Sequence, residues 1–316
     1  MGTLSLSEYE DVSIWVPWGH ISGRWYGNRK ERPILAIHGY TDNLGTFDRL
    51  IPLLPDYLGV LCIDLPGHGC SSGLPPGIQY TFVEWSYVIN RIMRQFKWSK
   101  VSLMGHSMGG VMGFLHTCLA PHTVDFIITI EAVLNPVGRV KDLSAYAFNI
   151  DKFVEEVERS SSSTIYEANS HTLQHFCDFL NVYTFESVPT DRAQHLLNRV
   201  MHRSQLYPDK FYLLRDNRTK FVNDFVMTPE LGTEMARRIR NKPYLIIKGS
   251  DSHYITDNDY QVITILRDQN PQFEFHEVPG KHHVHLSNAE DCAKYIIPFL
   301  RQHRPPPKKE ETKHRL

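Results

Sequence analysis

Residues 105–109 read Gly-His-Ser-Met-Gly, a serine with a glycine two residues away on each side. The apolar stretch before this pattern predicts a buried strand, and the apolar stretch after it predicts a helix. In a strand-to-helix turn of this kind the serine has strained backbone angles, and small flanking residues let strand and helix approach closely. The pattern therefore predicts that Ser107 is a nucleophile at the carboxyl edge of a sheet. The N–H of Met108, at the start of the helix, is a candidate donor to an oxyanion.

A histidine and a carboxylate later in the chain would complete the chemistry that Ser107 needs. A serine hydroxyl is a weak nucleophile unless a base removes its proton and an acid orients that base. His282 follows an expected strand at 273–278 and is the predicted base, with His283 as the alternative. Asp251 follows an expected strand at 243–249 and is the predicted acid, with Glu131, after an earlier strand, as the alternative position.

The loop after another expected strand supplies a second oxyanion donor. Residues 34–39 read Ile-Leu-Ala-Ile-His-Gly, and the N–H of Tyr40 follows them, where we expect it to face the serine. Histidine-rich stretches such as the one at 282–285 can bind metal. The carboxylate or thiol partners that would complete such a site are not visible nearby in the sequence. We therefore predict no metal and no cofactor.

Strands and helices alternate in the part of the chain that carries these residues. Short apolar runs at 21–27, 32–39, 59–65, 100–106 and 124–133 predict strands, and amphipathic or apolar segments at 46–57, 82–96 and 108–120 predict helices. Because the strands are apolar almost throughout, we expect a mostly parallel sheet with helices on both faces, an α/β fold.

The pattern changes to helices alone between about residues 136 and 235. Segments 149–160, 170–180 and 190–203 have helical periodicity, and no buried strand is expected between them. The strand pattern resumes at 243–249, and a last helix is expected at 289–302. We therefore predict a core of residues 1–135 and 236–303, a helical lid of residues 136–235 and a disordered, proline-rich, charged tail of residues 304–316.

The amino-acid composition of the chain excludes several classes of binding partner. The chain of 316 residues has 34 Lys and Arg against 35 Asp and Glu, so no charge excess indicates nucleic acid or an anionic membrane surface. Its five cysteines are scattered without the spacing of a metal or redox site, no stretch has transmembrane length, and the first residues lack a secretory pattern. A small-molecule partner and a cytoplasmic location are expected, and His314-Arg315-Leu316 adds a variant peroxisomal signal as a hypothesis.

Several motifs together resemble the α/β-hydrolase superfamily over residues 12–303. They are HGYTDN, DLPGHGCSS, GHSMGG, GSD and GKHHVHL. The HG-x-x-DN loop, the GHSMGG turn and RDNR in the insertion resemble the serine hydrolase-like, or kraken-type, proteins within it. This resemblance implies Ser107 as nucleophile, Asp251 as acid, His282 as base, and Tyr40 and Met108 as oxyanion donors. Epoxide hydrolases and haloalkane dehalogenases of similar architecture use an aspartate at the turn, so Ser107 argues against both.

The expected activity is hydrolysis of a carboxylic ester or thioester through a covalent acyl-enzyme. The same triad can cleave a carbon–carbon bond next to a ketone, and a non-catalytic member of the fold that binds a ligand is the alternative outside the enzyme class. Aromatic side chains of the predicted lid could line a pocket for an apolar acyl or aryl group. They are Phe148, Phe153, Phe176, Phe179, Tyr183, Tyr207 and Phe211.

Overall fold

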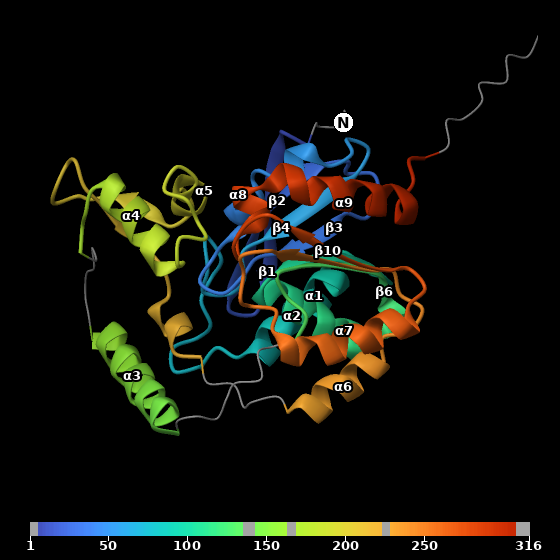
Figure 1. Cartoon of the computed structure of the whole chain (residues 1–316). Helices are drawn as coiled ribbons and strands as arrows, with labels where there is room; N and C mark the ends of the chain where they lie inside the picture. The colour runs from blue at the N-terminus through green and yellow to red at the C-terminus, as the bar shows by residue number, and fades with distance from the viewer. Residues whose placement is uncertain (1–5, 135–142, 163–168, 223–227, 308–316) are drawn as a thin grey trace, which may run out of the picture.

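A central sheet organises the computed structural model, which describes residues 6–134, 143–162, 169–222 and 228–307. In these residues eight strands pair in the order β1-β2-β4-β3-β5-β6-β9-β10 (Figure 1). The first two strands pair antiparallel, and the six from β4 to β10 run parallel. The bounds are β1 (Tyr9–Val16), β2 (Gly19–Gly27), β3 (Ile34–Ile37), β4 (Gly59–Ile63), β5 (Val101–His106), β6 (Val124–Ile130), β9 (Tyr244–Gly249) and β10 (Phe273–Val278). The predicted mostly parallel sheet is confirmed.

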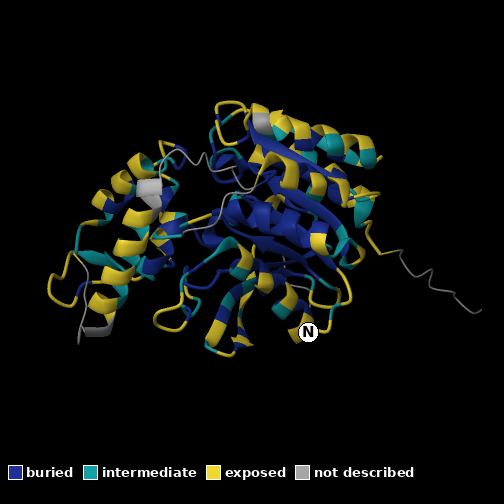
Figure 2. Cartoon of the chain, turned by 90° about the horizontal axis from the view of Figure 1, so that it is seen from below, coloured by how far each residue is buried: buried dark blue, intermediate teal, exposed yellow. Residues whose placement is uncertain are grey.

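Helices cover both faces of this sheet because its strands are apolar on both sides. In β3, Leu35 and Ile37 belong to the apolar core of one face, and Ile34 and Ala36 to that of the other. The first face carries α1 (Phe82–Gln95), α2 (Met108–Leu119), α6 (Pro229–Arg237) and α7 (Asp257–Gln269). The second carries α9 (Ala289–His303) and the short helices α8 (Val284–Ser287), η1 (Leu44–Phe47) and η2 (Ile51–Leu53). Figure 2 shows the sheet buried and the outer helix faces exposed.

The insertion between β6 and α6 lies to one side of the sheet (Figure 1). It contains α3 (Leu143–Ser162), α4 (Leu173–Tyr183), α5 (Ala193–Leu197), β7 (Met201–Arg203), β8 (Phe211–Leu213) and η4 (Asn217–Lys220). The predicted helices at 149–160 and 170–180 are present. The prediction of a helix at 190–203 is wrong beyond Leu197, where α5 ends. Residues 201–203 form strand β7 instead and pair with β8 in antiparallel orientation. Helix α6 packs against α2 and α7 of the core, so the boundary predicted at residue 235 falls inside a core helix.

The structure differs from two other predictions. Residues 46–57 form short 3-10 turns where a continuous helix was predicted, and Pro52 and Pro55 explain the interruption because proline lacks the N–H that a helix needs. The tail predicted from residue 304 is held at its start, since the Tyr57 hydroxyl donates to the Arg304 carbonyl at 2.8 Å. The hypothetical peroxisomal signal at 314–316 lies outside the described residues. None of the described helices is long and apolar enough to cross a membrane.

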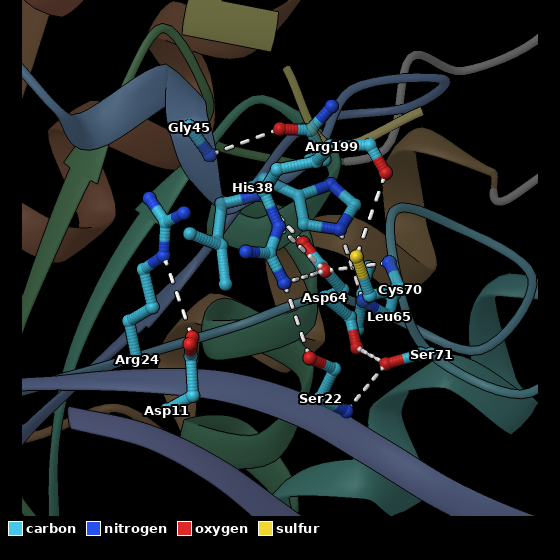
Figure 3. A network of polar contacts seen from close by, with 12 residues as sticks. Asp11, Ser22, Arg24, His38, Gly45, Asp64, Leu65, Cys70, Ser71 and Arg199 are labelled. Atoms are coloured by element: carbon cyan, nitrogen blue, oxygen red, sulfur yellow. Dashed lines mark hydrogen bonds and ion pairs between the residues drawn. The ribbon is translucent and has the colours of Figure 1, made fainter. Parts of the chain in front are cut away.

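A buried ion pair ties the insertion to the core (Figure 3). Arg199, just after α5, places its Nε at 2.9 Å and its Nη2 at 2.6 Å from Asp64 Oδ2. Asp64 follows β4, has no exposed surface, and accepts further hydrogen bonds from the N–H groups of Leu44 and Cys70. The Arg199 side chain is 5% exposed. The carboxylate of Asp64 is therefore surrounded by donors from the insertion and from two core loops.

Candidate active site

Ser107 stands between β5 and α2 with a backbone that few non-glycine residues adopt. Its φ is 49° and its ψ is −119°, and its N–H donates to the carbonyl oxygen of Ile130 at 2.9 Å. Its side chain is partly exposed among buried neighbours. Met108 is the first residue of α2, where N–H groups have no acceptor inside the helix and the helix dipole favours negative charge.

Close packing of strand and helix explains the two glycines of the turn. A Cβ on Gly105 would lie 2.3 Å from the carbonyl carbon of Gly109. A Cβ on Gly109 would lie 2.1 Å from the carbonyl oxygen of Ile37 in β3. Both distances are shorter than any real contact of a Cβ atom, so a side chain at either position would push α2 away from the sheet.

The structure brings His282 to Glu131. His282 Nδ1 lies 3.1 Å from Glu131 Oε2 and donates to it, and Glu131 is 2% exposed. Glu131 also accepts from the N–H of Gly249 at 2.5 Å and from the hydroxyl of Ser252. Burial raises the pKa of Glu131, and these donors oppose that rise. Burial lowers the pKa of His282, which favours the neutral imidazole. Because Nδ1 faces the Glu131 carboxylate, the proton of the neutral ring is on Nδ1 and the lone pair is on Nε2.

Asp251, the predicted acid, does not lie against His282. It is exposed, its N–H donates to the carbonyl oxygen of Gly280 at 2.9 Å, and its carboxylate lies 3.3 Å from the Ser250 hydroxyl. The carboxylate that contacts the imidazole is Glu131, the position that the sequence left as the alternative. Glu131 directly follows β6, the strand between β5 and β9, whereas Asp251 comes two residues after β9 ends and turns toward solvent.

The neighbouring histidines turn in other directions. His283 Nδ1 lies 2.5 Å from the hydroxyl of Ser187 in the insertion, and His285 Nε2 lies 2.8 Å from the hydroxyl of Thr46. His282 is therefore the histidine of this stretch whose ring reaches the buried carboxylate. Its backbone is tied to the serine turn, because Nε2 of His106 donates to the His282 carbonyl oxygen at 3.0 Å.

The loop that carries Tyr40 lies against the serine. A Cβ on Gly39 would be 3.2 Å from the Cβ of Ser107. His38 fixes this loop: its Nε2 accepts from the N–H of Leu65 at 2.9 Å, so its proton is on Nδ1, which donates to the Gly39 carbonyl oxygen at 2.7 Å. Tyr40 follows directly, which puts its N–H in the loop that faces Ser107.

A narrow pocket of about 50 Å³ opens between this loop and the insertion. Residues 41–43 and 67–69 line it from the core, and apolar side chains of α4 and α5 line it from the insertion. It shares Gly67, Gly69, Leu213 and Arg215 with a wider cleft of about 970 Å³. Three of the seven predicted aromatic residues line the pocket, namely Phe176, Phe179 and Tyr183. Phe211 packs against an apolar cluster formed by the insertion and Leu286 of α8. Phe153 is partly exposed on α3, and Phe148 and Tyr207 are exposed.

Tyr254 is a neighbour of the site that the sequence did not indicate. Its ring stacks on the His282 imidazole, with centroids 3.5 Å apart and planes 16° from parallel. Tyr254 lies in the loop between β9 and α7, and the residue is 53% exposed. No local pattern marks a loop tyrosine for such a contact, because the contact depends on where two separate loops meet.

The fold and this arrangement define the class of protein. The chain belongs to the α/β-hydrolase family, since the family model for the alpha/beta hydrolase fold matches residues 32–289. A probable serine hydrolase of Drosophila melanogaster is 35% identical over 95% of this chain and 90% of its own length. Serine hydrolase-like protein 2 of Homo sapiens is 29% identical over 92% of this chain and 93% of its own length. The resemblance to serine hydrolase-like proteins is confirmed.

Solved structures agree on the fold. A hypothetical protein of Pseudomonas aeruginosa matches 92% of this chain and 99% of its own with a TM-score of 0.75 at 21% identity. The thioesterase domain from the curacin biosynthetic pathway matches 92% of this chain and 99% of its own with a TM-score of 0.74 at 20% identity.

Proposed function

We propose that this protein is a serine hydrolase that cleaves a carboxylic ester or thioester through a covalent acyl-enzyme. The observation that carries the proposal is the 3.1 Å contact between His282 Nδ1 and buried Glu131, beside the strained turn that presents Ser107. A neutral histidine oriented by a buried acid is the base that a serine nucleophile requires. The proposed triad is Ser107, His282 and Glu131, and Glu131 takes the role that was predicted for Asp251.

The reaction follows from the tautomer of His282. Its Nε2 lone pair takes the proton of Ser107 as the serine oxygen attacks the carbonyl carbon, and the imidazolium then gives that proton to the leaving alcohol or thiol. Glu131 stabilises the imidazolium through the bond to Nδ1. The N–H groups of Tyr40 and Met108 hold the oxyanion of the tetrahedral intermediate. A water molecule activated by the same histidine releases the acid and restores the serine.

The pocket beside the Tyr40 loop supports a substrate with a short apolar acyl group. Its small volume and its lining by Phe176, Phe179 and leucine side chains suit a few carbon atoms. The insertion thus acts as the lid of the proposed site, since its helices α4 and α5 line this pocket opposite residues 41–43.

Labelling with a fluorophosphonate probe tests the proposal. We expect wild-type protein to be labelled, Ser107→Ala to lose labelling completely, and His282→Ala to lose nearly all of it because no base remains. His285→Gln can keep the contact to the Thr46 hydroxyl and should still be labelled. Gel fluorescence after a fixed time with the probe measures each variant.

Two outcomes would contradict this proposal. Labelling that survives in Ser107→Ala would place the nucleophile elsewhere. A folded wild-type protein that the probe does not label would identify a non-catalytic member of the fold that uses the pocket to bind a ligand.

The stacking of Tyr254 on His282 predicts a smaller effect on rate. Stacked rings contribute about 1 kcal/mol beyond their area, so Tyr254→Ala should lower kcat/KM about fivefold by loosening the imidazole. Tyr254→Phe keeps the ring and should stay within about twofold of wild type. Steady-state hydrolysis of a short acyl ester measures both. Equal losses in the two variants would mean that the hydroxyl, not the stacked ring, matters.

A further inference from the structure

Three buried side chains, Asp42, His106 and His283, face one another beside the proposed catalytic residues. Asp42 Oδ2, His106 Nδ1 and His283 Nε2 all lie within 4.8 Å of one another. Asp42 Oδ2 is 3.6 Å from His106 Nδ1 and 3.8 Å from His283 Nε2, which is too far for hydrogen bonds. Among the described residues, neither Asp42 Oδ2 nor His106 Nδ1 has any hydrogen-bond partner.

The opposite nitrogen of each ring has a hydrogen-bond partner, and this partner limits what each ring can present to the carboxylate. His106 Nε2 contacts the carbonyl oxygen of His282, which can only accept, so the proton of a neutral His106 is on Nε2. Its Nδ1 then points a lone pair at Asp42. His283 Nδ1 contacts the hydroxyl of Ser187, which can accept its proton and so leave a second lone pair on Nε2.

In the Asp42 carboxylate, too, one polar atom has a hydrogen-bond partner and the other has none in the part of the chain that the structure describes. Asp42 is 6% exposed, and its Oδ1 accepts from the N–H of Asn43 at 2.9 Å, while Oδ2 faces the two rings. In the tautomers that leave both of these ring nitrogens unprotonated, lone pairs converge in a buried space without a donor, which is unfavourable and rarely left unsatisfied in proteins. A cation between them removes that cost. Ligand histidines typically donate their other N–H to a carbonyl or a similar acceptor, as these two can.

We propose that Asp42, His106 and His283 bind a divalent transition-metal ion, and that the ion is zinc. Two imidazole nitrogens and one carboxylate oxygen are a ligand set that zinc prefers. With metal-ligand distances of about 2.0–2.2 Å, ligand atoms around zinc lie roughly 3.4 Å apart. Asp42 Oδ2, at 3.6 and 3.8 Å from the two histidine nitrogens, therefore needs to approach each by a few tenths of an ångström, and the two nitrogens, which lie within 4.8 Å of each other, need to close by up to about 1.4 Å. Asp42 also lines the small pocket, which gives the ion a route in.

The position of this site indicates what the ion would do. Asp42 comes two residues after the proposed oxyanion donor Tyr40, and His106 and His283 are each adjacent in sequence to a member of the proposed triad. The ion would therefore join the loop after β3, the last residue of β5 and the loop after β10, and hold these segments at fixed spacing. Its role is to position these segments, and it takes no part in bond making.

Metal analysis of the purified full chain tests the site. After stripping with a chelator and reloading with zinc, we expect one zinc per wild-type chain by plasma mass spectrometry. Asp42→Asn keeps the acceptor for Asn43, and His283→Asn keeps a partner for Ser187, yet each removes a ligand atom and should lose the zinc. At a zinc concentration a hundredfold above Kd, the Tm of the wild type should rise by about 5 °C.

His285→Gln is the matched control. The His285 ring lies 4.2 Å from that of His106, and glutamine can keep the contact to Thr46, so this variant should retain one zinc. Cobalt in place of zinc should give the wild type a visible absorption band that added zinc abolishes, a readout that needs no variant. A wild type that binds no zinc, or binding that survives in both Asp42→Asn and His283→Asn, would overturn the proposal.

Discussion

Replacing Glu131 by glutamine should lower kcat/KM for a short acyl ester about 10⁴-fold, the loss seen when a triad acid becomes an amide of the same shape. Glutamine can present its NH2 to His282 Nδ1, which would hold the imidazole in the tautomer with the proton on Nε2. That tautomer cannot accept the proton of Ser107. The amide also carries no charge to stabilise the imidazolium. Steady-state kinetics on the substrate that wild type hydrolyses fastest measures the loss.

The control for this prediction is Asp251→Asn, because Asp251 is the acid that chain order favours. It is exposed and lies in the same segment as Ser252, so the substitution should leave kcat/KM within about twofold. Thermal unfolding of both variants separates chemistry from folding, since Glu131 also accepts from Gly249 and Ser252. A large loss of kcat/KM in Asp251→Asn with little change in Glu131→Gln would mean that Asp251, and not Glu131, is the catalytic acid.

The contrast between these two acids shows what sequence patterns can predict here. Ser107 was predictable because its glycines, strand and helix are all local, and the structure has that turn. The choice between Glu131 and Asp251 was not predictable, because each residue follows the carboxyl end of a parallel strand and so lies at the same edge of the sheet. It depends on the order β5-β6-β9, in which Glu131 stands nearest the serine turn. No residue pattern at either position records that order.

The directions of the histidine side chains were likewise not predictable from the sequence. The sequence placed His282, His283 and His285 just past one strand, and nothing in their spacing says which ring meets a carboxylate. The structure separates them through Glu131, Ser187 and Thr46, which come from three other parts of the chain. For the same reason the sequence predicted no metal partner, although a carboxylate 241 residues earlier faces His283.

Secondary structure was predictable where the apolar pattern is long and decided locally. Helices α1, α2 and α9 and seven of the eight strands described in the main sheet follow their patterns closely. Strand β1 (Tyr9–Val16) was not predicted, and it forms by antiparallel pairing with β2. The segments at 46–57 and 190–203 have helical periodicity but form short turns and a strand. Two prolines interrupt the first, and pairing with residues 211–213 changes the second, so tertiary contacts outweigh propensity there.

Removing the Arg199 side chain should produce the largest loss of stability. Arg199→Ala leaves the fully buried carboxylate of Asp64 without its cation, and the free energy of unfolding should fall by about 3–5 kcal/mol. Chemical denaturation followed by circular dichroism measures it. Arg237→Ala makes the same change in an exposed pair with Glu234 and should cost less than about 1 kcal/mol.

A double variant identifies the cause of that loss. If the stranded charge is responsible, adding Asp64→Asn to Arg199→Ala should recover part of the free energy, because a neutral amide costs less to bury than an unpaired carboxylate. If the loss comes from the packing of the arginine stem, the second substitution adds a further penalty, since asparagine serves the N–H groups of Leu44 and Cys70 less well. Recovery would mean that charge neutralisation by Arg199 helps to hold the insertion on the core, together with contacts such as that of Ser187 with His283 and of Asp216 with Tyr80.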